Sequence, residues 1–452
     1  AIQHWDIDGL KQEFGYAGGS GINAKYDYRK LGETWSTPRI IRIKVSGKDK
    51  WVAVFGGGYN GAVNPNVGSA VFVMDLEDEG RLLKVIDIED TAKQSYGWTG
   101  RLFKRVGGVL VDGNTKLQAK GSGTFPDMCF DSSKGESFTA EFTPSVGFTL
   151  HFYIGSGSKD CLDYVKFDEA WPNTRNGGPP KPDYGYFFFR KMSNDIVNSL
   201  PADLSVITAD GTDKANYNGA LIYATDLEGK LTKINLTDKG TLYETTTLFT
   251  AESTSANGRY IYTRPEVTIN NDNNLWLYFG TGNTQKLQSQ SSQVKNRLYG
   301  IKDKNFPNFV KVNPAGDVSK CKTAPTCPGD TDLGWYVDLK KSQKLTAEPT
   351  VDKDRVYFPI YEPTAANNKC GTGIAILMAY DTKCGNSLLN VRLGKGVLSK
   401  VVKQGDNLYI GIAGEADKNI SGFTSKDNLI TGKSKAKDTG NEVQLEKWIE
   451  NY

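Results

Sequence analysis

Apolar and polar residues alternate along much of this chain with the period of two that is typical of β-strands. The clearest example is residues 219–236, GALIYATDLEGKLTKINL. Two alternating runs are separated there by Asp-Leu-Glu-Gly, which has the composition of a tight turn. The pattern predicts a β-hairpin with strands at 220–225 and 231–236.

The hairpin is one copy of a repeating unit. Similar runs of apolar strands and turns occupy five segments, which are residues 35–88, 200–236, 264–303, 347–393 and 397–414. The last of these segments loses its regularity beyond its final residue. Four short antiparallel strands per unit, recurring about every 50 residues, are the signature of a β-propeller.

Two residue types mark the units. A proline stands near the first strand of four of them, namely Pro38, Pro201, Pro265 and Pro349. An aspartate ends a later strand of the same four units, namely Asp75, Asp226, Asp303 and Asp381. Proline is tolerated at a strand entrance because that residue need not donate a hydrogen bond to the neighbouring strand.

We therefore expect an all-β chain that folds as a modified β-propeller of repeated antiparallel sheets. A single unit cannot bury both faces of its sheet, whereas units stacked around an axis bury those faces and shield the sheet edges. The propeller is expected to comprise residues 1–90 and 199–452. Residues 441–452 have helical periodicity, although they can equally be read as a closing strand.

Residues 91–198 interrupt the repeats and are expected to form an insertion within the propeller. The insertion is rich in strand patterns and contains the loop sequence WPNTRNGGPPKPDYGYFFFR at 171–190. Long insertions on a rigid scaffold are common binding surfaces, so Tyr184, Tyr186 and Phe187 are candidate ligand contacts. The alternative is that these rings pack the insertion onto the propeller.

Charge and hydropathy exclude two classes of partner. The 55 basic and 52 acidic residues nearly balance, whereas nucleic-acid binding usually needs a concentrated basic face. No apolar run approaches the ~20 residues of a membrane-spanning helix. The chain begins at Ala1 without a signal-peptide pattern, which fits either a removed leader or a fragment.

Six cysteines indicate disulfides and an oxidising compartment outside the cytoplasm. No pair has the spacing of a zinc site, and the chain has only two histidines. Pairing of neighbours along the chain predicts three bridges, namely Cys129–Cys161, Cys321–Cys327 and Cys370–Cys384. Fifteen connectivities are possible in principle, and six buried free thiols are the alternative.

Several long stretches resemble the C-terminal region of PilC/PilY-type proteins, which are type IV pilus-associated adhesins and biogenesis factors of Gram-negative bacteria. The stretches are WSTPRIIRIKVSGKDKWVAVFGGGYN, IYATDLEGKLTKINL, RPEVTINNDNNLWLYFGTGN, GWYVDLKKSQKLTAEPTVDKDRVYFPIYEP and CGTGIAILMAYD. They cover most of residues 32–393 outside the insertion and follow the order of the family.

The resemblance implies a secreted protein at the pilus tip or outer cell surface. In that family the C-terminal propeller supports pilus extension against retraction, and the whole protein contributes to adhesion. The implied partners are minor pilins of the pilus tip and a host-surface receptor. The family's N-terminal A-domain and the earlier part of its propeller have no match in this chain, and the insertion at 91–198 also departs from the pattern.

The resemblance also points to a calcium loop, because many family members carry an aspartate-rich loop before the strand matching 220–225. The corresponding stretch is TADGTDKANYNG at 208–219, whose oxygen-bearing side chains are those of Asp210, Thr212, Asp213, Asn216 and Asn218. Calcium takes six to eight oxygen ligands, and no bidentate carboxylate closes this loop. A weak calcium site and a plain turn both remain open.

An enzymatic propeller is the alternative function. The repeats also look like those of quinoprotein dehydrogenases, so the second reading is a propeller that binds a sugar or small molecule, including a quinoprotein-like oxidoreductase. That family places two adjacent cysteines against its quinone, and no two cysteines are adjacent here. A Ser-His-Asp hydrolase would need His4 or His151, and His151 stands in an alternating strand. We therefore expect a non-enzymatic protein without catalytic residues.

Overall fold

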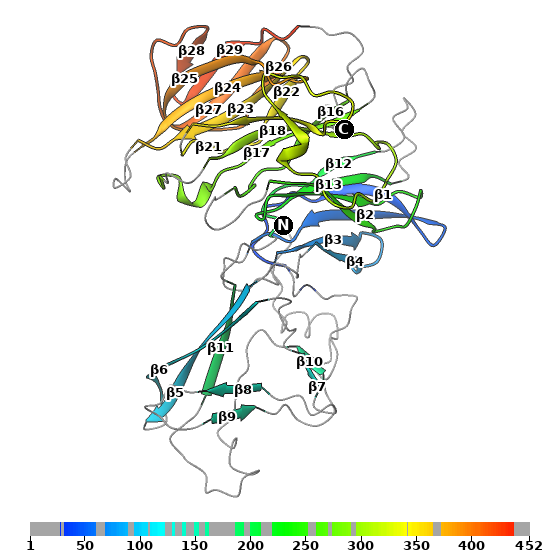
Figure 1. Ribbon diagram of the computed structural model, residues 1–452, viewed down its shortest axis with the longest axis vertical. Helices are drawn as coiled ribbons and strands as arrows, with labels where there is room; N and C mark the ends of the chain where they lie inside the picture. Colours follow the sequence, from blue (N-terminus) through cyan, green and yellow to red (C-terminus); the bar gives the residue numbers. More distant parts are fainter. Residues whose placement is uncertain are drawn as a thin grey trace, which may run out of the picture. The chain divides into compact units, whose positions relative to one another are not determined.

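The computed structural model describes the chain in ten stretches, together with the backbone of the strands between residues 95 and 193. The stretches are residue 28 and residues 31–59, 68–88, 199–208, 219–251, 259–269, 274–290, 295–340, 342–364 and 372–437. This part of the chain is all-β, as expected, and is built of several antiparallel sheets (Figure 1). The only helical segments described are two 3-10 turns, η4 (Thr284–Lys286) and η5 (Val318–Lys320).

The contacts divide the chain into two compact units. Unit 1 comprises residues 1–30, 60–67 and 89–197, and unit 2 comprises residues 31–59, 68–88 and 198–452. Residues 1–27 and 438–452, which we expect to belong to the propeller, lie outside the described residues.

In unit 1 the structure describes the backbone of three small sheets. The largest has the strand order β11-β5-β6, from Tyr186–Ser193, Ser95–Val106 and Val109–Ser122. The two others pair β7 (Cys129–Asp131) with β10 (Lys159–Cys161), and β8 (Phe138–Glu141) with β9 (Thr149–Phe152).

Unit 2 begins with two four-stranded sheets in which consecutive strands pair with their neighbours. The first sheet consists of β1 (Arg39–Val45), β2 (Lys48–Gly56), β3 (Ala70–Asp75) and β4 (Leu82–Asp87). The second consists of β12 (Ser205–Ile207), β13 (Leu221–Thr225), β14 (Lys230–Asn235) and β15 (Thr245–Thr250). Strands β13 and β14 confirm the hairpin predicted at 219–236.

The third sheet has the order β16-β17-β18-β20-β19. Its strands are β16 (Glu266–Ile269), β17 (Leu275–Gly280), β18 (Arg297–Asp303), β20 (Gly334–Asp338) and β19 (Cys321–Thr323). The first four are antiparallel, whereas β19 joins β20 in parallel from a long excursion of the chain.

A nine-stranded sheet follows, and it consists of two halves that share β25. The fourth sheet, as we call its first half, contains β21 (Lys344–Leu345), β22 (Thr350–Asp352), β23 (Arg355–Glu362), β24 (Ile374–Asp381) and β25 (Ser387–Leu398). The fifth sheet contains the end of β25 with β26 (Val402–Gln404), β27 (Asn407–Ala416), β28 (Phe423–Lys426) and β29 (Leu429–Lys433). The expectation that regularity ends after residue 414 is therefore wrong, since a hairpin of β28 and β29 completes this unit.

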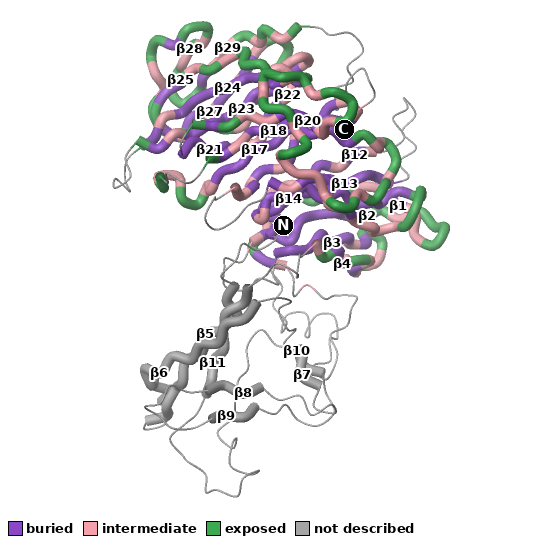
Figure 2. The backbone as a smooth tube through the Cα atoms, in the orientation of Figure 1, coloured by how far each residue is buried: buried purple, intermediate pink, exposed green. Residues whose placement is uncertain are grey.

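Alternate residues of the inner strands enter different hydrophobic cores. In β13, Ile222 and Ala224 belong to the core shared with the first sheet, whereas Leu221 and Tyr223 belong to the core shared with the third sheet. The same division continues along the chain. In β17, Leu277 and Phe279 enter the core shared with the second sheet, whereas Trp276 and Tyr278 enter the core shared with the fourth sheet. In β23, Phe358 enters that latter core and Tyr357 enters the core shared with the fifth sheet. Consecutive sheets therefore stack face to face, and the middle strands are buried on both sides (Figure 2).

Short polar side chains tie the first strands of consecutive sheets together. The Ser205 hydroxyl in β12 donates to the Pro265 carbonyl at the start of β16, at 2.5 Å. The Thr350 hydroxyl in β22 donates to the Val401 carbonyl at the start of β26, at 2.7 Å. The prolines at these entrances fit because their backbone nitrogens are not needed by a neighbouring strand.

Candidate functional site

A long excursion between β18 and β20 is the largest described connection in unit 2, and we call residues 304–333 the anchored loop. Its middle runs beside β15, where the Thr250 amide donates to the Gly316 carbonyl at 2.9 Å. The Thr246 hydroxyl accepts from the Val312 amide at 2.8 Å and donates to the carbonyl of the same residue at 3.2 Å. The loop therefore covers the edge of the second sheet while presenting exposed residues such as Val310.

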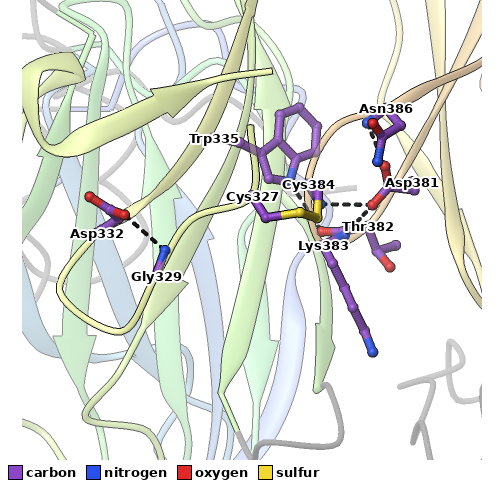
Figure 3. Close-up of a disulfide and its surroundings, with 9 residues drawn as sticks. All are labelled: Cys327, Gly329, Asp332, Trp335, Asp381, Thr382, Lys383, Cys384 and Asn386. Carbon is purple, nitrogen blue, oxygen red and sulfur yellow. Dashed lines mark hydrogen bonds between the residues drawn. A yellow bond between two sulfur atoms is a disulfide. The ribbon is translucent and has the colours of Figure 1, made fainter. Parts of the chain in front are cut away.

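A disulfide fixes the end of the anchored loop to the next sheet. Cys327 is bonded to Cys384, which lies in the turn between β24 and β25 (Figure 3). Asp381 stabilises this turn, because its carboxylate accepts a hydrogen bond from the Cys384 amide at 2.7 Å. The Trp335 indole donates to the Thr382 carbonyl of the same turn at 3.1 Å.

Two of the three predicted pairings, Cys321–Cys327 and Cys370–Cys384, are wrong because Cys327 is bonded to Cys384. The third sheet stacks on the fourth and brings the anchored loop to the β24–β25 turn. Pairing cysteines by their distance along the chain does not take this stacking into account. Cys321 opens β19 and packs against the core between the second and third sheets as a free thiol, and burial, with Asp317 and Asp332 nearby, raises its pKa to about 12. Cys370 lies outside the described residues.

The third predicted pairing concerns unit 1. The backbone register of β7 and β10 sets Cys129 directly opposite Cys161. Only the backbone is described there, so the Cys129–Cys161 bridge stays a prediction.

The aspartates that recur at strand ends hold turns. A carboxylate oxygen of each aspartate accepts a hydrogen bond from a backbone amide in the turn that follows. The pairs are Asp75 with Glu77 at 3.0 Å, Asp226 with Lys230 at 2.9 Å, Asp303 with Asn305 at 3.1 Å and Asp381 with Lys383 at 3.0 Å. Such side-chain bonds to nearby backbone explain why aspartate recurs where a strand must turn.

A buried lysine lies beneath the anchored loop. The Lys233 ammonium in β14 lies 2.5 Å from the Asp303 carboxylate and 2.8 Å from the Asn308 carbonyl, and both charged side chains are almost fully buried. The Tyr223 hydroxyl donates to the same carboxylate at 2.7 Å. Burial lowers the pKa of Lys233 against the opposing effect of Asp303, and burial together with Asp303 raises the pKa of Tyr223 well above its usual value.

Sequence reasoning missed this group, although a signal for it exists. In a strand with period two, Lys233 falls on the same face as Leu231, which is a core residue. A lysine on the apolar face of a buried strand needs an anionic partner, and Asp303 at the end of β18 in the neighbouring sheet is that partner.

Four charged residues form a second cluster where the first strands begin, and we call Arg264, Glu266, Glu348 and Lys400 the entrance cluster. The Lys400 ammonium lies 2.9 Å from Glu266 and 3.2 Å from Glu348. The Arg264 guanidinium lies 3.0 Å from Glu348. The cluster joins the third, fourth and fifth sheets at their entrances, and each partly exposed pair within it is weakly stabilising.

Comparison with known proteins gives one informative match. The chain is 27% identical over 229 residues to a type IV pilus biogenesis factor PilY1 homolog of Xylella fastidiosa. The match covers 40% of this chain and 16% of the relative, so the chain spans a small part of the relative's length. No family model matches the chain. The similarity indicates a distant relationship to a type IV pilus-associated protein.

The candidate calcium ligands Asp210, Thr212, Asp213, Asn216 and Asn218 all lie outside the described residues. The strands on either side are described and pair at Ile207 and Leu221, so the ends of the segment are held together. Among the side chains that are described, no group of three or more His, Cys, Asp or Glu residues is arranged to hold a metal ion.

The candidate ligand contacts of unit 1 are described only in part. Tyr186 and Phe187 stand in β11 with their backbones opposite Phe103 and Leu102 of β5, and Tyr184 lies outside the described residues. Their role in binding stays a prediction. Within the described part of the chain, no helix is long and apolar enough to cross a membrane.

Proposed function

We propose that this chain is a C-terminal propeller region of a secreted type IV pilus-tip protein that supports pilus extension and adhesion. The observation that carries the proposal is the distant similarity to a PilY1 homolog, a type IV pilus biogenesis factor. Its natural location is the pilus tip or outer surface of a Gram-negative bacterium, and its natural partners are minor pilins and a host-surface receptor.

The stacked sheets of unit 2 support the propeller part of the proposal. Successive sheets share hydrophobic cores, and hydroxyl-to-carbonyl bonds join their first strands. In a propeller the first strand of each blade lies nearest the axis, so links between first strands are the contacts that a radial arrangement requires. An experimental structure in which these sheets do not circle an axis would contradict the architecture.

The anchored loop is the described segment best suited to contact a pilin. It is exposed along much of its length, and the disulfide together with bonds to β15 holds its backbone in one conformation. A pre-ordered loop loses less conformational entropy on binding than a mobile one. Its role is therefore to present a rigid binding surface.

The test is capture of purified minor pilins by the immobilised chain, comparing the wild type with a variant of the anchored loop. Val310→Asp and Lys320→Glu together change two exposed residues of the loop and should weaken capture at least tenfold. A matched variant, Lys426→Glu in β28, changes an exposed lysine of another sheet and should bind as the wild type does. Capture that is absent from the wild-type chain would overturn the pilin-binding role.

We further propose that the protein acts by binding and catalyses no reaction. The strand-end aspartates support this because their carboxylates are engaged in turn bonds. The rival oxidoreductase reading is tested by the absorption spectrum of the purified protein. The spectrum of a bound quinone, with turnover of a sugar or alcohol, would overturn the proposal.

A further inference from the structure

Lys233 and Asp303 come from different sheets and meet in the core between them. The Lys233 Nζ lies 2.5 Å from an Asp303 carboxyl oxygen, and the two side chains are 0% and 1% exposed. The carboxyl carbon is therefore within reach of the amine after a small rotation of either side chain. Water has no access to the pair.

The surroundings of the pair are aromatic. The Lys233 Nζ lies 5.9 Å from the ring centre of Tyr223 and 5.9 Å from that of Phe309. Separated charges are costly in such a place, because desolvation of each ion offsets much of their attraction. Transfer of one proton from the ammonium to the carboxylate gives a neutral amine next to a neutral carboxylic acid, which burial favours.

Both carboxyl oxygens also receive hydrogen bonds. The Tyr223 hydroxyl donates to one of them at 2.7 Å, and the Asn305 amide donates to the other at 3.1 Å. Donors in these positions stabilise the negative charge that develops on a carboxyl group when an amine adds to its carbon. The Asn308 carbonyl, which accepts from Lys233 at 2.8 Å, holds the amine in place.

We propose that Lys233 and Asp303 condense to an isopeptide bond that covalently links the second and third sheets. The neutral Nζ adds to Cγ of Asp303, a C–N bond forms, and a C–O bond of the carboxyl group breaks. The departing oxygen leaves as water with its own proton and one from the amine. No atom changes its oxidation state, and no further reactant is needed.

A second lysine–aspartate pair provides an internal control. Lys50 lies 2.5 Å from Asp75, which is the same distance, but the Lys50 side chain is 28% exposed. Water reaches the Lys50 ammonium and keeps it charged, so the neutral amine that must add to the carboxyl carbon does not form. Lys50 and Asp75 should therefore remain an ordinary ion pair in the same molecule.

The test is the mass of the purified chain after reduction and denaturation. The wild type should be lighter than its sequence mass by one water molecule. Trypsin should fail to cut after Lys233, and the peptides that contain Lys233 and Asp303 should be recovered as one branched species. Peptides containing Lys50 and Asp75 should be recovered separately. A wild-type chain at its full sequence mass would overturn the proposal.

Variants locate the bond. Lys233→Arg should have its full sequence mass, whereas Lys230→Arg, three residues away on β14, should keep the deficit of one water. Asp303→Asn offers a carboxamide to the same amine and should lose ammonia, so that its final mass equals that of the cross-linked wild type. A water deficit that persists in Lys233→Arg would place the modification elsewhere and overturn the assignment.

Discussion

Cys327 and Cys384 are bonded between the third and fourth sheets although 57 residues separate them in the chain. The bond joins the end of the anchored loop to the β24–β25 turn, and each partner lies in a segment that is already fixed by hydrogen bonds. In the unfolded chain it closes a long loop, which is the situation in which a disulfide most reduces the entropy of unfolding.

Replacing both cysteines by serine should lower the free energy of unfolding by about 2–4 kcal/mol. Urea unfolding of Cys327→Ser/Cys384→Ser against the wild type measures this change. Cys321→Ser is the control, because it removes a thiol without removing a bridge and should cost less.

Thiol labelling provides an independent check on the pairing. In the unreduced, denatured protein, Cys321 should react with iodoacetamide, whereas Cys327 and Cys384 should not. Recovery of Cys327 in a labelled peptide would contradict the assignment.

Asp381 should contribute to stability through the β24–β25 turn. Its carboxylate accepts from the amides of Lys383, Cys384 and Asn386. Asp381→Ala leaves these amides without their acceptor and should lower the free energy of unfolding by about 2 kcal/mol. Asp406→Ala, in an exposed turn of the fifth sheet, should change it far less. Equal effects of the two substitutions in thermal unfolding would show that the turn bonds are unimportant.

The backbones of β25 and β27 lie close together where the two strands pair at Gly396, so this glycine should be hard to replace. Gly396 lies opposite Gly414 with a φ of 129°, and an added Cβ would lie 2.2 Å from the Ala413 carbonyl oxygen. Backbone strain and overlap add, so Gly396→Ala should cost about 3 kcal/mol or more. Gly405, with a φ of 56° and open space around it, is the control and should cost about 1 kcal/mol when changed to Ala. Urea unfolding of both variants decides the matter.

A local sequence pattern predicts strands and their faces, but not which sheets stack on one another. The alternation at 219–236 determines strands and faces, because side chains of a strand point to opposite sides. The Cys327–Cys384 bridge and the Lys233–Asp303 contact depend on which sheets stack, and no local pattern records that. The turn aspartates lie between these cases, since the sequence identifies Asp381 as a strand-ending residue, whereas its three amide partners depend on how the turn folds.

The proposed calcium loop has a direct test. We propose that residues 209–218 bind calcium weakly, because the flanking strands hold the two ends together and the segment offers two carboxylates among neutral oxygens. Isothermal titration of the wild type with calcium should give heat that Asp210→Ala abolishes. Asp238→Ala, an exposed residue of the same sheet, should titrate as the wild type does. A wild type that gives no heat would remove the calcium role.

Lys344 should make stability depend on pH in the alkaline range. Its ammonium is buried and donates to the carbonyls of Leu287 and Ser289 at 2.7 and 2.8 Å. Burial lowers its pKa from 10.5 to about 8. The unfolded chain therefore binds more protons than the folded chain between about pH 8 and pH 10.5, and in that window stability should rise with pH through this group.

The measurement compares the wild type with Lys344→Met, which keeps the length of the side chain and removes its titration. From pH 8 to pH 10.5 the free energy of unfolding of the wild type should increase relative to that of the variant, by about 3 kcal/mol at most. Other groups that titrate in this range, such as the buried tyrosines, are common to both proteins and cancel in the difference. A difference that stays constant or falls with pH would show that Lys344 keeps an ordinary pKa in the folded protein, and the desolvation argued from its burial would then be wrong.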